Sequence, residues 1–195
     1  NLIAYTWPLL VAAGLIAMRR VARPLRLATL ALAGFVGAAL VITGGERALT
    51  LQGELYGYAA AIGSAVCMAY YTLMIGRTSV APERLLLPSA LVGLAGTLAW
   101  SIADGIPTAS AGALLGGLYL GAGPMGLGYF FWSKAMRSDA GGRMAILGYL
   151  TPIGSTALLV AWGENLSHLA AVGAALVIGS CLAVGLQQIE RKAHA

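Results

Sequence analysis

Charged side chains are scarce in this sequence. Asp, Glu, Lys and Arg together make up 10% of the 195 residues, while hydrophobic residues make up 59%. A soluble domain usually carries about 25% charged residues. A chain this apolar lacks the polar side chains needed to cover a water-exposed surface, so we exclude a water-soluble globular domain.

Residues that build disulfide scaffolds, metal sites and catalytic centres are also few. The two cysteines, Cys67 and Cys181, lie inside apolar runs, where a neutral core thiol is the simplest interpretation. His168 and His194 have no other metal-ligating residues near them in the sequence, so we expect neither a metal site nor a cofactor. Paired carboxylates and a Ser/His pair at one membrane depth are missing, so we do not expect an enzyme.

Long apolar runs are what the sequence does have. There are seven, each long enough, or nearly so, for a helix to cross the hydrocarbon core of a membrane. They are Leu2–Met18, Leu27–Thr43, Leu55–Ile75, Leu85–Ala103, Ala111–Met136, Met144–Trp162 and Leu169–Leu186. The runs are longer than barrel strands and do not alternate in polarity. The sequence therefore predicts an all-α polytopic membrane protein with seven transmembrane helices.

The basic residues occupy every second loop. Eleven of the twelve fall on one predicted side of the membrane, and Arg47 alone falls on the other. The eleven are Arg19, Arg20, Arg23, Arg26, Arg77, Arg84, Lys134, Arg137, Arg143, Arg191 and Lys192. The positive-inside rule makes their side, and the C-terminus, cytoplasmic. A nucleic-acid-binding surface would not follow alternate loops, so we expect a lipid bilayer and no nucleic acid as partner.

An internal repeat gives the architecture. The hexapeptide GAALVI occurs at 37–42 and again at 173–178, and each copy follows a span with a Tyr-x-x-Pro motif, Tyr5–Pro8 and Tyr149–Pro152. The charge pattern places the two motifs in opposite directions across the membrane. Inverted repeats are typical of secondary transporters. We therefore interpret the seven helices as helices 4–10 of a ten-helix inverted-repeat transporter, with three further helices before Asn1.

With these motifs the chain resembles the EamA branch of the drug/metabolite transporter superfamily. The resemblance rests on residues 1–8 (NLIAYTWP), 121–132 (GAGPMGLGYFFW), 149–152 (YLTP), 163–164 and 173–178. The first two segments are most similar to the bacterial aromatic amino acid exporters of that branch. The resemblance implies that residues 1–43 are the last two helices of a first five-helix repeat. It makes 55–188 the second repeat and 189–195 a cytoplasmic tail, in a bacterial inner membrane.

The two Tyr-x-x-Pro segments are the first candidates for substrate binding. Tyr5 and Trp7 offer aromatic faces, and Pro8 is expected to bend the helix and free a backbone carbonyl. Tyr149, Thr151 and Pro152 are their counterparts in the second repeat. Two other interpretations stay open: a belt of aromatic residues at the membrane interface, and a purely structural kink.

A third candidate segment follows a glycine-rich stretch. Met125, Tyr129 and Trp132, with Met136, recur at helical spacing and predict one stripe that lines a cavity, or else packs against a neighbouring helix. The preceding GAGPMG formally matches GxGxxG but lies inside an apolar run, so it predicts a bend rather than a dinucleotide site. Pro124 joins Pro8 and Pro152 as a predicted hinge.

Together these features predict a secondary transporter that exports aromatic and other neutral amino acids by alternating access. No Asp, Glu, Lys or Arg lies near the centre of any of the seven runs, which indicates a neutral or zwitterionic substrate. Export of other hydrophobic metabolites or drugs is the alternative.

Overall fold

The computed structural model describes residues 2–44, 55–105, 110–138, 143–163, 165 and 167–193, and every element found in these ranges is helical. The chain divides into two compact units, residues 1–74 with 139–195 and residues 75–138. Proteins that cross lipid as helices satisfy their backbone hydrogen bonds within each segment.

Four helices among the described residues are long and apolar enough to cross a membrane. They cover Pro24–Thr43, Leu55–Ile75, Arg84–Asp104 and Ala111–Arg137. Three shorter apolar helices cover Ala4–Ala17, Ala145–Ala161 and His168–Val184. The prediction of an all-helical membrane protein is confirmed, while the full set of seven crossings stays a prediction.

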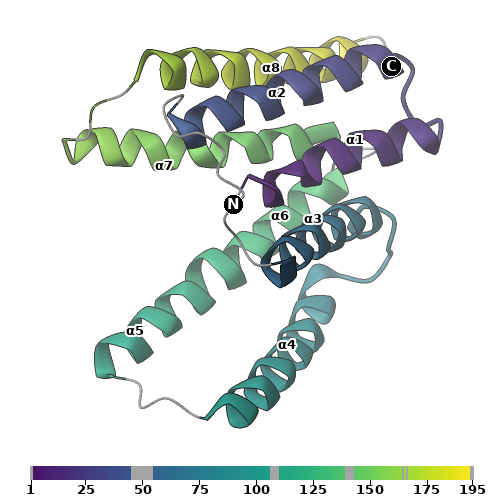
Figure 1. Ribbon diagram of the computed structural model, residues 1–195. Coiled ribbons are helices and arrows are strands. Elements are labelled where there is room, and N and C mark those ends of the chain that lie inside the picture. The colour runs from purple at the N-terminus through teal and green to yellow at the C-terminus, as the bar shows by residue number, and fades with distance from the viewer. Residues whose placement is uncertain are drawn as a thin grey trace. The chain divides into compact units, whose positions relative to one another are not determined.

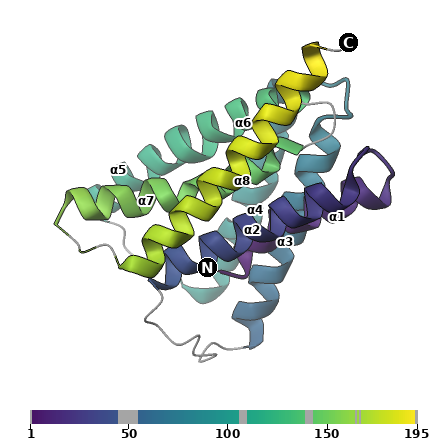
Figure 2. The same cartoon turned by 90° about the horizontal axis from the view of Figure 1, so that it is seen from above.

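The first unit is organised around two helices far apart in the sequence. Helix α2 (Pro24–Thr43) and helix α8 (His168–Ala193) lie side by side in Figures 1 and 2 and carry the two GAALVI copies. A Cβ atom added at Gly37 would lie 2.6 Å from the carbonyl oxygen of Gly173, and one added at Gly173 would lie 2.6 Å from that of Gly37. The absence of side chains here lets the two backbones approach closely, as small residues do in membranes.

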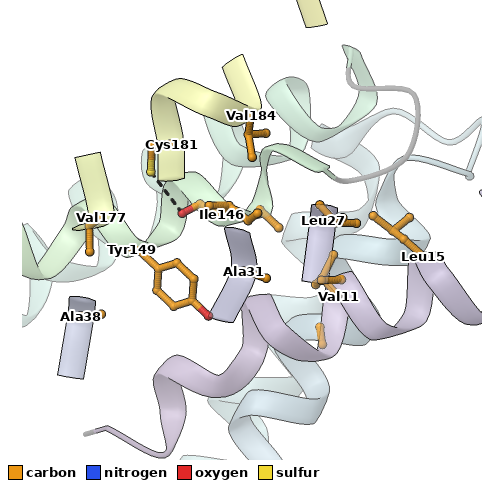
Figure 3. Close-up of a cluster of buried hydrophobic side chains, with 13 residues drawn as sticks. Val11, Leu15, Leu27, Ala31, Ala38, Ile146, Tyr149, Val177, Cys181 and Val184 are labelled. Atoms are coloured by element: carbon orange, nitrogen blue, oxygen red, sulfur yellow. Dashed lines mark hydrogen bonds between the residues drawn. The ribbon is translucent and has the colours of Figure 1, made fainter. Parts of the chain in front are cut away.

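Four further elements of this unit pack against that pair: η1 (Ala4–Thr6), α1 (Trp7–Ala17), the 3₁₀ helix η3 (Arg143–Tyr149) and α7 (Leu150–Ala161). Helix α3 (Leu55–Ile75) instead contacts α1, where a Cβ atom added at Gly14 would lie 2.7 Å from the Leu73 side chain. The core in Figure 3 combines Val11 and Leu15 of α1, Ala31 of α2, Ile146 of η3 and Val177 of α8. The thiol of Cys181 donates a hydrogen bond to the carbonyl oxygen of Ile146, at 3.6 Å. Cys181 is thus a core residue, as expected, whereas the same expectation is wrong for Cys67, which is exposed on α3.

A serine joins the ends of α2 and α8. Gly44 closes α2 in the left-handed conformation, with φ of 62°. The Ser167 hydroxyl donates to the carbonyl oxygen of Gly44 at 2.6 Å and accepts from the backbone N–H of Ala170 at 3.1 Å. One side chain therefore caps the start of α8 and satisfies a carbonyl at the end of α2.

The second unit contains α4 (Pro82–Asp104), α5 (Ala111–Leu120), η2 (Gly121–Leu127) and α6 (Gly128–Ser138). The run Ala111–Met136 is helical throughout, as expected, but η2 is a π-helix between the α-helices α5 and α6. The expected single helix over Met144–Trp162 is likewise divided into η3 and α7.

Candidate functional site

Both Tyr-x-x-Pro segments form the same local structure. In each, a 3₁₀ turn runs directly into an α-helix: η1 leads into α1 at Tyr5–Pro8, and η3 leads into α7 at Tyr149–Pro152. The prolines lie in the first turn of the α-helix, where a backbone N–H has no partner within an isolated helix. Neither proline therefore interrupts a formed helix, which differs from the kinked spans expected from the sequence.

The carbonyl group that Pro8 was expected to leave free has a hydrogen-bond partner. The carbonyl of Ala4, four residues earlier, was expected to be left free by the missing N–H of proline. It instead accepts a hydrogen bond from the backbone N–H of Trp7. The Thr6 hydroxyl donates to the carbonyl oxygen of Ile3 at 2.7 Å. The 3₁₀ turn thus satisfies the carbonyl that Pro8 was expected to leave free for a substrate.

The structure brings the two segments together. A Cβ atom at Gly148 would overlap the Trp7 indole and come within 2.8 Å of its Cη2 atom. Trp7 and Tyr5 are both half-buried, and Pro8 is buried. Only a residue without a side chain at position 148 lets the indole lie against the η3 backbone. An aromatic side chain of one repeated motif therefore covers the residue just before the other motif.

Tyr149 lies deeper than its counterpart Tyr5. Its side chain is fully buried, and its ring lies over Gly34 of α2, where an added Cβ would be 2.6 Å from the ring Cδ2 atom. The hydroxyl points toward α1 (Figure 3), and no side chain or backbone group among the described residues lies in hydrogen-bond geometry with it. A buried hydroxyl without a partner is destabilising. Among the residues that the structure describes, this oxygen is the one buried side-chain nitrogen or oxygen atom without a hydrogen-bond partner.

The other two residues of the second motif lie differently. The Thr151 side chain is exposed, and Pro152 is buried. Their positions in the first turn of α7 follow directly from the 3₁₀ helix that precedes it. Binding by any of the six residues of the two motifs stays a prediction.

The third candidate segment belongs to the second unit. Met125 is 56% exposed, Tyr129 is 37% exposed, Trp132 is half-buried and Met136 is buried. Because Met125 lies in the π-helix and the others lie in α6, the spacing of a regular α-helix does not extend across all four residues. The stripe expected from the sequence is confined to α6.

The glycines of η2 explain why a π-helix forms there. A Cβ atom at Gly126 would lie 2.9 Å from the carbonyl oxygen of Gly121, five residues earlier in the chain. The backbone N–H of Gly128 reaches back five residues to the carbonyl oxygen of Gly123. Pro124, which lacks an N–H, lies inside this stretch. The proline and glycines predict a bend, which stays a prediction; the π-helical form of this stretch was not expected.

Metal-binding chemistry has no evident place in the part of the chain that the structure describes. No group of three or more His, Cys, Asp and Glu side chains occurs among those residues. His194, Arg47 and Glu164, which entered the sequence argument, lie outside the described residues.

Four helices long and apolar enough to cross a membrane, among the residues that the structure describes, define a multi-pass membrane protein. Residues 55–186 match the EamA-like transporter family, and the chain belongs to that family. Over 197 residues it is 28% identical to the aromatic amino acid exporter YddG of Ancylobacter novellus. That match covers 95% of this chain and 63% of the exporter, so the chain spans less than two thirds of its relative. No solved structure matches the chain.

The family assignment confirms the resemblance drawn from the sequence motifs, including the likeness to aromatic amino acid exporters.

Proposed function

We propose that this chain forms part of a secondary transporter that exports aromatic and other neutral amino acids across the bacterial inner membrane. Transport would proceed by alternating access, with two inverted five-helix repeats moving about a site near the middle of the membrane. The chain would contribute the last two helices of the first repeat, residues 1–43, and the whole of the second, residues 55–188. Its C-terminus would lie in the cytoplasm.

The observation that carries this proposal is the contact of Trp7 with Gly148. It joins the two Tyr-x-x-Pro segments, one from each proposed repeat. Substrate sites of inverted-repeat transporters lie between the repeats, at interrupted helices. Both segments depart from regular α-helix, because each changes from 3₁₀ to α geometry within the motif. A substrate that enters between them would meet Tyr5 and Trp7, whose rings are only half-buried.

The chemistry of these segments fits a neutral or zwitterionic substrate. Residues 1–18 contain no charged side chain, and the apolar runs have none near their centres. An intramembrane charge would mark a binding site for an ion or a charged drug. Aromatic faces instead suit the apolar side chain of an aromatic amino acid. The name of the Ancylobacter relative, an aromatic amino acid exporter, supports the same substrate class.

We assign Tyr149 to the substrate-dependent step rather than to the resting structure. Its hydroxyl lacks a partner in the conformation described, among the residues that the structure places. Movement of α1 away from η3 would uncover this oxygen and let it bind the polar groups of an amino acid, with Thr151 nearby in the chain. The substrate would then relieve the cost of a buried, unpaired hydroxyl.

Three prolines are the proposed hinges. Pro8 and Pro152 lie at the junctions between 3₁₀ and α geometry, and Pro124 lies in the π-helix. Such junctions change their hydrogen-bond pattern more easily than a regular α-helix, and π-helical turns are frequent at functional sites. Met125, Tyr129 and Trp132, which follow the third hinge, would line the substrate path.

The experiment measures efflux of labelled phenylalanine from proteoliposomes that contain the complete protein. We expect saturable efflux of phenylalanine, tyrosine and tryptophan, and none of lysine or glutamate. Tyr149→Phe removes only the hydroxyl and should lower transport at unchanged or higher thermal stability. Trp100→Phe is the matched control, since Trp100 is 74% exposed and lies in α4, outside the candidate segments. Its transport should equal that of the parent.

Two results would contradict the proposal in different ways. Folded protein without efflux above empty liposomes would overturn the amino acid assignment. Efflux of other hydrophobic metabolites would then favour the alternative substrate class of the same family. If Tyr149→Phe leaves efflux unchanged, the substrate assignment stands and the Tyr149 hydroxyl is excluded from the binding site.

A further inference from the structure

The turn between α1 and α2 concentrates positive charge. Within eight residues it carries Arg19, Arg20, Arg23 and Arg26, which we call the four-arginine turn. No Asp or Glu occurs anywhere in residues 1–45. All four arginine side chains are exposed, and none has an ion pair or side-chain hydrogen bond to another residue that the structure describes. The turn therefore presents four positive charges without an ion-pair partner among the side chains that the structure describes.

Local backbone structure does not explain all of these arginines. Arg19 adopts the left-handed conformation, with φ of 53°. Its backbone N–H donates to the carbonyl oxygen of Ile16, and the backbone N–H of Arg20 donates to the carbonyl oxygen of Leu15. This is the helix ending at which glycine is usual, and a residue with a side chain is disfavoured there. Arg23 and Arg26 flank the first turn of α2, where the helix dipole disfavours cations. Glycine is abundant in this sequence, so arginine at position 19 calls for another reason.

An exposed leucine lies among the charges. Leu25 is 81% exposed and lies in the first turn of α2. Helix α2 is itself the candidate membrane span Pro24–Thr43. Its position at the end of a membrane-spanning segment places it at the depth where lipid headgroups meet acyl chains. Arginines around an exposed apolar side chain are complementary to an anionic phospholipid, which offers a phosphate above a hydrocarbon chain.

We propose that the four-arginine turn is a binding surface for anionic phospholipids. The guanidinium groups bind the phosphodiester oxygens of the headgroup, and Leu25 lies against the acyl chains. Anionic lipid held at this point joins the ends of α1 and α2. The inference depends on the membrane location of the chain and not on the identity of the transported substrate.

The test counts the lipids that the complete protein retains, by native mass spectrometry, from equal amounts of phosphatidylglycerol and phosphatidylcholine. Each arginine near an anionic surface contributes about fivefold in binding, so Arg20→Gln/Arg23→Gln should lower the preference for phosphatidylglycerol about 30-fold. Arg77→Gln/Arg84→Gln removes the same charge from another loop and should leave the preference unchanged. Equal retention of both lipids by the parent, or equal loss in both double variants, would overturn the proposal.

Two further measurements separate lipid from free phosphate and do not depend on the double variant being folded. Leu25→Gln keeps every charge and should weaken retention of phosphatidylglycerol, because only a lipid uses the apolar contact. Added salt should weaken retention by the unaltered protein. Inorganic phosphate, compared with chloride at equal ionic strength, should not displace the lipid. Displacement by phosphate, with no effect of Leu25→Gln, would show a phosphate site and overturn the lipid assignment.

Discussion

The two Tyr-x-x-Pro segments share a backbone structure but differ in what surrounds them. Both pass from a 3₁₀ turn into an α-helix, and both place proline in the first α-helical turn. Tyr5 is half-buried, whereas Tyr149 is fully buried over Gly34. A repeated motif therefore specifies local geometry, while the residue across from it decides how deep the tyrosine lies.

The largest expected effect comes from truncating each tyrosine in turn. Tyr149→Ala should lower the free energy of unfolding by about 3–5 kcal/mol, the range for removing a large buried side chain. Tyr5→Ala should cost clearly less, because its ring already has a solvent- or lipid-facing side. Thermal and denaturant unfolding in the same detergent would compare the two. Equal losses of unfolding free energy in the two variants would contradict the deeper burial of the Tyr149 side chain.

The next effect tests the contact that holds the two GAALVI helices together. Gly37→Ala places a Cβ 2.6 Å from the carbonyl oxygen of Gly173. Overpacking of this kind costs about 1–3 kcal/mol. Gly179→Ala in α8, where a Cβ meets nothing within 4 Å, is the matched control. It should be neutral or stabilising by up to about 1 kcal/mol, as is usual for glycine replaced in a helix. A stable Gly37→Ala protein would contradict the close backbone contact.

The smallest effect distinguishes two serine caps. Ser167 caps α8 and also donates to Gly44, whereas Ser110 only caps α5 by accepting from Ala113 at 3.2 Å. Replacing a serine cap by alanine costs about 0.5–2 kcal/mol. The loss in free energy of unfolding should therefore be near the upper end of that range for Ser167→Ala and near the lower end for Ser110→Ala. Hydrogen exchange at the end of α2 should rise in Ser167→Ala alone, since only that variant frees the Gly44 carbonyl.

The membrane class and the family followed from the sequence because they depend on composition and local motifs. Long apolar runs need no tertiary information, and the segments around Trp7 and Pro124 carried the family likeness on their own. The repeated hexapeptide also indicated which helices correspond, although it said nothing of their contact. That contact became visible only where Gly37 and Gly173 meet across 136 residues.

The candidate site was less accessible to sequence reasoning. The pattern around Pro8 predicted a free carbonyl, because it assumed a continuous α-helix through residue 4. The 3₁₀ turn instead supplies the N–H of Trp7 to that group. Tyr149 likewise matched Tyr5 in sequence, but its depth depends on Gly34, a residue 115 positions away in the chain. Helix type and long-range partners are set by tertiary packing, which a motif does not contain.

The π-helical turn at Gly121–Leu127 has a consequence for comparing relatives of this protein. Five-residue hydrogen bonding, as from Gly128 to Gly123, accommodates more residues per turn than the α-helix on either side. A relative with an uninterrupted α-helix here would align best with a one-residue gap inside GAGPMGL. A gap placed elsewhere would shift the helical face assigned to Tyr129 and Trp132 by about 100°, the rotation per residue of an α-helix. Alignments of this region are best anchored separately before and after the turn.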